Sequence, residues 1–364
     1  MSLSLSHSVC DLVEFFFNIP GIRRKQIRRL AGHYPDLASC LRQGPENLAK
    51  KLPDLESASL KSYFQEVIAR ASSSKKNFLS YLNPIFPPRL EHLHDPPCGF
   101  YFRGRAELLQ FGSPWIGIVG TRYPSPYALK ACAALIEAMR PYRPVIVSGM
   151  ALGIDGMAHQ TALEHGLETV GVLGCGIDEV YPSRHANLFK RMEEKGLLIT
   201  EVGEKSLRGA WRFPERNRII AALSEAVLIL EAPEKSGALI TAKHALELGK
   251  EIFVLPGRTD HPKNVGGHRL IQDGAHLLME VEEVFSSLGF QTGASKSPKG
   301  VEVSQDLSAE AQKILNSLRG SALHIDKIAH LSELPAPRVS GLIMELVLSG
   351  HIAELPGKVF EIID

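Results

Sequence analysis

The stretch Phe213-Pro214-Glu215-Arg216-Asn217-Arg218 places an aromatic, an asparagine and two arginines at the expected start of a helix. Proline suits the first position of a helix, where no backbone N–H is needed. The N-terminus of a helix also carries partial positive charge, so this stretch is suited to bind an anion. The alternative is that its arginines only form structural salt bridges.

The phase of the expected helix separates the two arginines. At about 100° per residue, Arg216 falls near the inward apolar stripe of residues 219–223, whereas Arg218 lies roughly 150° away from it. We therefore expect Arg216 to reach over the edge of a sheet toward Arg122. Arg218 is expected to point toward solvent, an extended ligand or a second subunit.

A repeating pattern of strands and helices surrounds this stretch. Short apolar runs occur at residues 115–119, 145–148, 169–173, 197–200, 226–230 and 251–255. Helical patterns lie near residues 126–139, 156–165, 185–195, 214–223, 238–248 and 267–273. Strands that are apolar throughout and separated by helices predict a parallel sheet covered on both faces. Ligands of such sheets bind at the carboxyl ends of the strands.

Glycine-containing turns follow five of these apolar runs. They are Gly120-Thr121-Arg122, Ser148-Gly149, Gly174-Cys175-Gly176, Ser236-Gly237 and Pro256-Gly257. Glycine lets the backbone approach a ligand closely, and several of these turns open onto a helix N-terminus. Together with the arginines they predict an anionic ligand of the nucleotide type. Neither GxGxxG after the first run nor GxxxxGK[ST] occurs, so a dinucleotide or ATP role lacks its fingerprint.

Few acids and histidines near this edge are placed for catalysis. Asp155 is expected to cap a helix that begins at Gly156. His159, on the same helix, is expected to be a packing or hydrogen-bonding histidine. Glu201 and Glu231 follow the fourth and fifth runs. Either could be a general base, or both could pair with the arginines of the opening stretch.

Composition suggests a globular protein of two or three domains with an uneven charge. Residues 20–51 hold eight Lys or Arg and two acids, whereas residues 301–364 hold five Lys or Arg and nine acids. This asymmetry suggests a nucleic-acid-facing front and an acidic tail, or simply solvated helix faces. Five cysteines form no CxxC pair, so a disulfide framework and a metal site are not expected. No cofactor is expected either. Without a leader or an apolar run of membrane length, we expect a cytoplasmic protein that does not insert into membranes.

The N-terminal residues 8–70 read as short helices. The turn at Ile19-Pro20-Gly21-Ile22, followed by a basic helix, is typical of a helix-hairpin-helix, whose backbone N–H groups bind a DNA phosphate. A weaker second copy lies at residues 52–55. The alternative is a helical bundle with a basic surface and no contact with DNA. Residues 77–113 predict a lead-in strand and loop that pack on the next domain.

The C-terminal residues predict a winged helix after a linker at 289–306. Three helical runs (308–318, 325–331 and 336–349) precede a strand pair near 352–355 and 359–362. Duplex binding is the usual function of such a module. Its negative charge opposes that function, because its expected recognition helix offers only Arg338 before Glu345. We therefore favour a protein-interaction or regulatory module.

Several motifs of the chain resemble those of a known family, DNA-processing protein A (DprA, also called Smf). They are Ile118–Arg122, Ser148–Asp155, Tyr181-Pro182, Phe213–Ile220, Ser236–Ala242 and Pro256-Gly257. Their order and spacing match across the central domain, and the helical N-terminal part and the winged helix also fit. The resemblance therefore covers nearly the full chain.

The resemblance implies an α/β fold with three domains. These are a helical SAM-like or helix-hairpin-helix-like domain at 1–72, an extended Rossmann-like, doubly wound domain at 77–288 and a winged helix at 307–364. It also implies a non-enzymatic homodimer that binds single-stranded DNA without sequence specificity, protects it and loads RecA onto it in natural transformation and DNA recombination. The DNA pocket of the family carries over to Gly120, Thr121, Arg122, Ser148, Gly149, Phe213, Arg216, Asn217 and Arg218. Arg184 stands where members often have a basic residue, and the edge turn adds Ser236 and Gly237.

Two other functions are compatible with the sequence. One is a nucleotide-processing enzyme similar to the lysine-decarboxylase-like phosphoribohydrolases, which have a related fold. Those enzymes need a Gly-Gly-x-Gly-Thr loop with a nearby glutamate, whereas the corresponding loop here is Ser236–Thr241 without such a glutamate. The other is a RecA-binding adaptor that contacts DNA only weakly.

Overall fold

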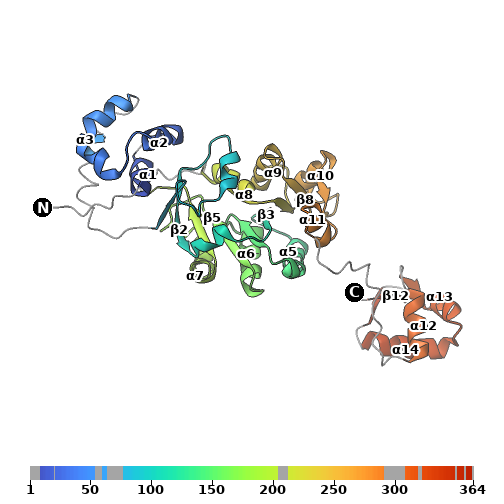
Figure 1. The fold of residues 1–364 in the computed structure, drawn as a ribbon. Coiled ribbons are helices and arrows are strands. Elements are labelled where there is room, and N and C mark those ends of the chain that lie inside the picture. The colour runs from blue at the N-terminus through green and yellow to red at the C-terminus, as the bar shows by residue number, and fades with distance from the viewer. Residues whose placement is uncertain are drawn as a thin grey trace. The chain divides into compact units, whose positions relative to one another are not determined.

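The computed structural model describes residues 9–19, 21–53, 60–63, 77–203, 212–290, 308–318, 322–348, 351–355 and 358–362 (Figure 1). The chain divides into two compact units, Met1–Thr292 and Gly293–Asp364. Among the described helices, none combines the length and the apolar character that crossing a membrane requires.

A nine-stranded sheet forms the centre of the first unit, in the order β1-β2-β6-β5-β4-β3-β7-β8-β9. The strands are β1 (Phe78–Ser80), β2 (Gly99–Gly104), β3 (Trp115–Gly120), β4 (Val145–Ser148), β5 (Glu168–Val172), β6 (Leu197–Thr200), β7 (Ala226–Leu230), β8 (Glu251–Val254) and β9 (His276–Leu277). Strands β3 to β9 pair in parallel, and β1 and β2 extend the sheet beyond β6 by antiparallel pairing. The lead-in predicted for residues 77–113 is therefore part of the sheet itself.

The sheet is doubly wound, which confirms the predicted fold class. Because β3 lies between β4 and β7, the chain winds outward from β3 to β6 on one side and from β7 to β9 on the other. Doubly wound folds bind ligands at this switch in strand order, outside the carboxyl ends of the strands. The topology thus predicts a ligand site at the loops after β3, β4 and β7.

Helices cover both faces of the sheet (Figure 1). They are α5 (Pro126–Ala138), α6 (Ile154–Glu164), α7 (Ala186–Lys195), α8 (Arg212–Leu223), α9 (Gly237–Glu247), α10 (Val265–Gln272) and α11 (Val281–Ser287), with short 3-10 helices η1 (Pro88–His92), η2 (Ala106–Gln110), η3 (Arg140–Tyr142) and η4 (Ser183–His185). Val145 and Val147 belong to the core beneath α8 and α9, whereas Ile146 belongs to the core beneath α5 and α6. Alternate residues of one strand therefore serve opposite layers, which explains why the strands are apolar throughout.

Among the described N-terminal helices, α1 (Val9–Phe17) packs on the β1–β2 edge of the sheet. Helices α2 (Arg24–Ala31) and α3 (Leu37–Lys51) pack on α1. Phe17 contacts Phe78 of β1 and Tyr101 of β2, with ring centroids 5.3 and 6.0 Å apart. Gly21 has a φ of +81° in the turn between α1 and α2. Pro20 of the predicted hairpin turn, and residues 54 and 55 of its weaker copy at residues 52–55, lie outside the described residues.

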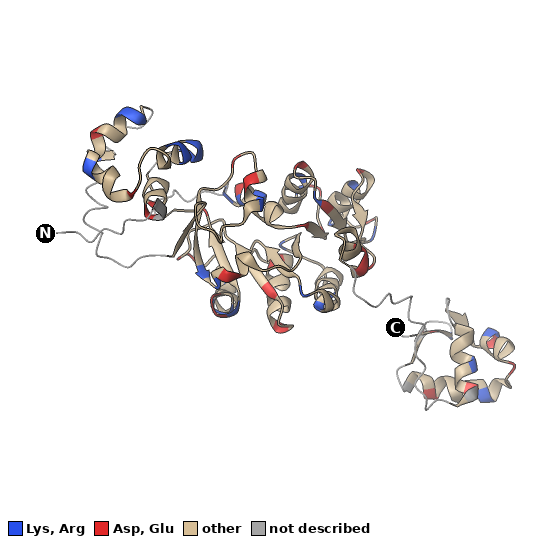
Figure 2. Ribbon diagram, in the orientation of Figure 1, with Lys and Arg blue, Asp and Glu red and all other residues tan. Residues whose placement is uncertain are grey.

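Helix α2 is rich in basic side chains (Figure 2). Two of them are already paired inside the unit, because Arg24 contacts Asp95, Glu201 and Glu215, and Arg28 contacts Glu91. The basic N-terminal surface is therefore smaller than the sequence predicts. Its binding of DNA stays a prediction.

The second unit is a winged helix, as predicted. Its elements are α12 (Ala309–Leu318), β10 (Leu323–His324), α13 (Ile325–Ser332), α14 (Ala336–Leu348), β11 (Ile352–Leu355) and β12 (Val359–Ile362), with the strands in the order β10-β12-β11. On α14, the position of a recognition helix, Arg338 is bound by Glu310 of α12 at 2.6 Å. A paired arginine is a poor ligand for a DNA phosphate, which weakens the case for duplex binding further.

Candidate functional site

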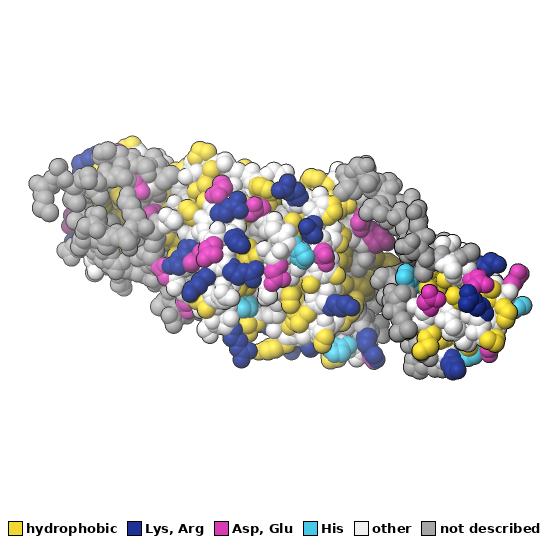
Figure 3. Space-filling view, turned by 90° about the horizontal axis from the view of Figure 1, so that it is seen from below, with side chains coloured by type: hydrophobic (Ala, Val, Ile, Leu, Met, Phe, Trp, Pro, Cys, Tyr) yellow, Lys and Arg dark blue, Asp and Glu magenta, His cyan; other side chains and the backbone are white. Residues whose placement is uncertain are grey.

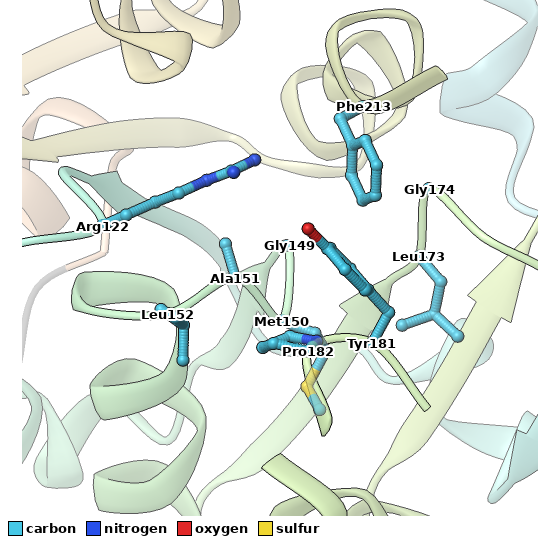
Figure 4. Close-up of a pocket in the computed structure, with 10 residues that line it drawn as sticks. All are labelled: Arg122, Gly149, Met150, Ala151, Leu152, Leu173, Gly174, Tyr181, Pro182 and Phe213. Atoms are coloured by element: carbon cyan, nitrogen blue, oxygen red, sulfur yellow. The ribbon is translucent and has the colours of Figure 1, made fainter. Parts of the chain in front are cut away.

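A small pocket of about 40 Å³ opens at the carboxyl ends of β3, β4 and β5 (Figure 4). It lies beside the switch in strand order. The residues that line it are Arg122, Gly149, Met150, Ala151, Leu152, Leu173, Gly174, Tyr181, Pro182 and Phe213. None of these ten carries a carboxylate, an imidazole or a thiol.

The pocket rim consists of Arg122, Tyr181 and Phe213. Figure 4 shows their side chains directed toward one another across the opening. The ring centroids of Tyr181 and Phe213 are 5.3 Å apart, and the guanidinium carbon of Arg122 lies 5.9 Å from the centroid of Phe213. Phe213 is half-buried, and Arg122 and Tyr181 are exposed. The rim therefore presents an aromatic face and a cation to solvent.

Gly174 makes room for the Phe213 ring. A Cβ at position 174 would lie 2.7 Å from a carbon of that ring, which is closer than real side chains approach. The absence of a side chain at Gly174 thus lets the Phe213 ring lie close to the loop after β5.

Gly149 lines the pocket, and two buried side chains outside the lining, Asp155 and Arg216, contact it; these three residues are called the pocket floor. Arg216, with 7% of its surface exposed, donates to the carbonyl oxygen of Gly149 at 2.7 Å and to that of Val172. From the other side, the carboxylate of Asp155 accepts a hydrogen bond from the Gly149 N–H at 3.1 Å. A Cβ at position 149 would lie 2.5 Å from Arg216 and 2.7 Å from Asp155. Only glycine fits between these two side chains.

Burial determines the electrostatics of the floor. It lowers the pKa of Arg216 to about 10, partly offset by the negative charge of Asp155. It raises the pKa of Asp155, against the opposing effect of Arg216. Arg216 therefore remains a cation at neutral pH, and its guanidinium is engaged by two backbone carbonyl oxygens of the interior.

A larger groove adjoins the pocket. It has a volume of about 610 Å³ and shares Arg122 and Leu152 with the pocket. Arg184, Asn187 and Arg191 line it from η4 and α7, opposite residues of α6. Three and four residues separate these positions, so they follow one helical face with a rise of about 5 Å per turn. Figure 3 shows basic side chains interspersed with acidic ones on the face that α5, α6 and α7 cover.

Two family models match this chain. The model of DNA recombination-mediator protein A matches residues 77–289, and the DprA winged helix domain matches residues 299–358. The chain belongs to the DNA recombination-mediator protein A family.

Relatives of this DprA-family chain include Protein Smf of Synechocystis, 33% identical over 318 residues that cover 78% of this chain and 79% of the relative. DNA processing protein DprA of Bacillus subtilis is 36% identical over 251 residues, covering 69% and 80%. The X-ray structure of DNA processing protein A from Streptococcus pneumoniae superposes with a TM-score of 0.67 at 29% identity, covering 79% of this chain and all of that one. A structure of DNA processing protein A from Helicobacter pylori, described as revealing a unique single-stranded DNA binding mode, has a TM-score of 0.53 at 30% identity and covers 58% and 96%.

The structure distributes the DprA-family site residues predicted from sequence over three positions. Arg122, Gly149 and Phe213 line the pocket, and Arg184 lines the groove. Others lie beneath these surfaces and support them: Ser148 donates to the carbonyl oxygen of Ile118 at 2.6 Å, Thr121 accepts from the N–H of Tyr123 at 3.2 Å, and Gly120 packs against Ile154. Asn217 donates to the carbonyl oxygen of Gly237 at 3.1 Å, and Ser236 caps α9 through the N–H of Ala238. Which of them contact DNA stays a prediction.

The prediction that Arg218 points toward solvent or a partner is wrong. Arg218 is 8% exposed and pairs with Glu201, which Arg24 also contacts. A helical wheel assumes that one face of a helix is free, whereas α8 lies between the sheet and the ion pairs that α2 supplies. Arg216 does point inward, but it ends beneath Gly149 rather than over the edge of the sheet.

The acids have more local functions than the sequence predicts. Glu201 pairs with Arg218, which is one of the two roles predicted for it. Glu231 instead accepts from the N–H of Ser125 at 2.6 Å, at the start of α5. Asp155 caps no helix, because α6 begins one residue earlier and Gly153 occupies the capping position. His159 is a buried hydrogen-bonding histidine, as predicted, 2.7 Å from the hydroxyl of Thr169.

Sequence reasoning missed Tyr181 as a member of the site. The residue belongs to a family motif, but nothing in its spacing shows that the loop after β5 returns to Phe213. An aromatic beside a proline in a long loop is the only local signal. Within the described residues, no group of three or more His, Cys, Asp or Glu could hold a metal ion.

Proposed function

We propose that this chain binds single-stranded DNA without sequence specificity at the pocket rim. The observation that carries the proposal is the half-buried Phe213 ring between the exposed Arg122 and Tyr181. Aromatic rings stack on any base, for about 1–3 kcal/mol per base, and do not read sequence. Arg122 forms no ion pair with the described residues, so its guanidinium is available to a phosphate. The description of the Helicobacter pylori relative supports the same ligand.

The groove between α6 and α7 is proposed to hold the continuing strand. Arg184 would bind one phosphate, and Arg191, which lies 3.9 Å from Glu164, would exchange that carboxylate for another phosphate. Asn187 offers a neutral hydrogen-bonding group between them. This arrangement favours a flexible single strand, because a backbone that must bend from a narrow pocket into a groove cannot stay in a stiff duplex.

The finer functions of the family belong to the same proposal. The chain is proposed to protect the strand, to load RecA onto it in natural transformation and DNA recombination, to act as a homodimer and to work in the cytoplasm. Family membership supports these four statements.

The enzymatic alternative gains no support from the site. A phosphoribohydrolase needs a carboxylate at the reacting bond, and no carboxylate lines the pocket. Two acids at this edge of the sheet accept hydrogen bonds from the backbone, Asp155 from the N–H of Gly149 and Glu231 from that of Ser125. We therefore propose that the protein is not an enzyme.

A salt-dependent titration tests the proposed function. Fluorescence anisotropy of a labelled oligo-dT and of a duplex of equal length gives the affinity of the full chain at several salt concentrations. We expect tighter binding of the single strand, and Arg122→Ala should reduce the slope of log K against log salt by about 0.7, the value for one lost contact to a single strand.

The matched control is Arg140→Ala in η3, which removes the same charge at the amino edge of the sheet. Arg140 is exposed and precedes β4. We expect it to leave both affinity and slope unchanged. Equal effects of the two substitutions, or no binding of the single strand by the wild type, would contradict the proposed function.

A further inference from the structure

Arg24, the first residue of α2, contacts three carboxylates from three separate segments. Its guanidinium lies 2.7 Å from Glu215 in the first turn of α8 and 3.1 Å from Glu201 after β6. It also pairs with Asp95 in the loop before β2. One side chain of the N-terminal helices therefore contacts the loop before β2, the segment after β6 and the helix that carries Phe213.

Arg24 is held to α8 by two routes. The direct route is its ion pair with Glu215, two residues after Phe213. The indirect route is through Glu201, which binds Arg24 on one side and the buried Arg218 of α8 on the other. Burial would lower the pKa of Arg24, but Glu201, Glu215 and Asp95 raise it above its ordinary value. The side chain therefore remains a cation at every pH at which the protein folds.

The ring of Phe213 and its backbone have different supports. The ring packs on Gly174 and Tyr181, but its backbone lies in the first turn of α8. The first N–H groups of a helix have no partner within that helix, so its first turn opens most readily. A bond from α2 to Glu215 holds this turn closed.

We propose that Arg24 is a positioning residue for Phe213, so that the N-terminal helices set the affinity of the pocket for a single strand. This inference rests on the proposed function, since it concerns the same site. Arg24 itself is not a DNA contact, because three carboxylates already occupy its guanidinium.

Two substitutions separate positioning from simple charge. Arg24→Ala removes a cation near an anion site, and Glu215→Ala removes an anion from it. Long-range attraction alone predicts that the first weakens DNA binding and the second strengthens it. Positioning predicts that both weaken it, because each breaks the same bond.

The experiment measures oligo-dT affinity and its salt dependence for the full-length wild type, R24A, E215A, the double variant R24A/E215A and the control R28A. We expect R24A and E215A each to weaken binding about fivefold, and the double variant to be no weaker than R24A alone, as for two residues in one interaction. The slope against salt should stay that of the wild type, since no phosphate contact is lost. R28A, which breaks the Arg28–Glu91 pair on the same helix, should bind as the wild type does.

Amide hydrogen exchange at residues 212–216 provides a readout that does not need DNA. We expect faster exchange in R24A and E215A, and unchanged exchange in R28A. E215A that binds as tightly as the wild type, or unchanged exchange in both variants, overturns the positioning role. If the wild type binds and Arg122→Ala weakens binding in such a case, the proposed function stands and only this inference fails.

Discussion

Arg216 in the pocket floor and Arg122 in the pocket rim lie at the same edge of the sheet, but they have different roles. Arg216 is 7% exposed and donates to two backbone carbonyl groups. Arg122 is exposed and lies over the ring of Phe213. One cation shapes the loop that approaches a ligand, and the other is free to meet that ligand.

This difference shows that the location of positive charge and its availability are separate questions. A buried arginine is retained only where carbonyl or carboxylate oxygens satisfy it, and it then has nothing left for a phosphate. Floor residues should therefore affect folding first, and rim residues should affect binding alone. The following substitutions test that division.

The largest effect is expected from Arg216→Ala. The change removes the hydrogen bonds of Arg216 to the carbonyl oxygens of Gly149 and Val172, and it removes the buried cation near Asp155. Breaking a buried charged interaction of this kind costs about 3–5 kcal/mol. Urea unfolding of the full chain measures the loss. Arg122→Ala is the matched rim control, and we expect it to unfold as the wild type does. Comparable losses in the two variants would abolish the distinction between floor and rim.

Gly149→Ala should have the next largest effect. Its new Cβ would lie 2.5 Å from Arg216 and 2.7 Å from Asp155, and both side chains are buried and hydrogen-bonded to the backbone. Overpacking of this kind costs about 1–3 kcal/mol. Thermal or urea unfolding measures it.

Gly237→Ala is the control for this substitution, because a Cβ there meets no atom within 4 Å. The residue lies at the start of α9, after its cap. We expect its unfolding free energy to equal or slightly exceed that of the wild type, since alanine favours a helix. An equally destabilised Gly237→Ala would show that the pocket floor imposes no special constraint at Gly149.

The contrast between Gly149 and Gly237 also shows which features of the site could be predicted from the sequence. Both stand in predicted edge turns, because apolar runs and glycine punctuation are local signals that define strands and their ends. Whether a glycine is squeezed between Arg216 and Asp155 depends on residues 67 and 6 positions away. That distance is set by the packing of α8 and α6, which no local pattern contains.

Arg218 and Tyr181 make two further contacts that sequence patterns could not predict. Helix phase correctly turned Arg216 inward, but it could not show that Glu201 and α2 cover the outer side of α8. Likewise, the alternation of strands and helices predicted the sheet edge, but not the return of the loop after β5 that brings Tyr181 to Phe213. Periodic order follows from sequence, whereas contacts between loops follow from the assembled fold.

Phe213→Ala tests the rim without disturbing the floor. The ring is half-buried, so we expect little change in unfolding and a loss of about 1–3 kcal/mol in the binding of a single strand, the range for one stacked base. Anisotropy titration with oligo-dT measures this loss. Phe213→Trp should retain most of the affinity because it keeps an aromatic face. Equal weakening by alanine and tryptophan would indicate that the ring packs the loop and does not stack on DNA.

The smallest effect concerns His159, which lies on α6 with the floor residue Asp155. Burial lowers the pKa of His159 to about 3, with smaller contributions from His185 and Arg216. An unfolded histidine takes up its proton near pH 6.5, so the unfolded chain binds more protons than the folded chain between those values. The stability is therefore complete above about pH 6.5 and falls as the pH falls, by about 0.7 kcal/mol between pH 7 and pH 6 for this group. Urea unfolding at the two pH values should show this loss in the wild type and in His165→Asn, but not in His159→Asn. The same loss in all three proteins would mean that water reaches His159, and that the floor is less closed than its hydrogen bonds indicate.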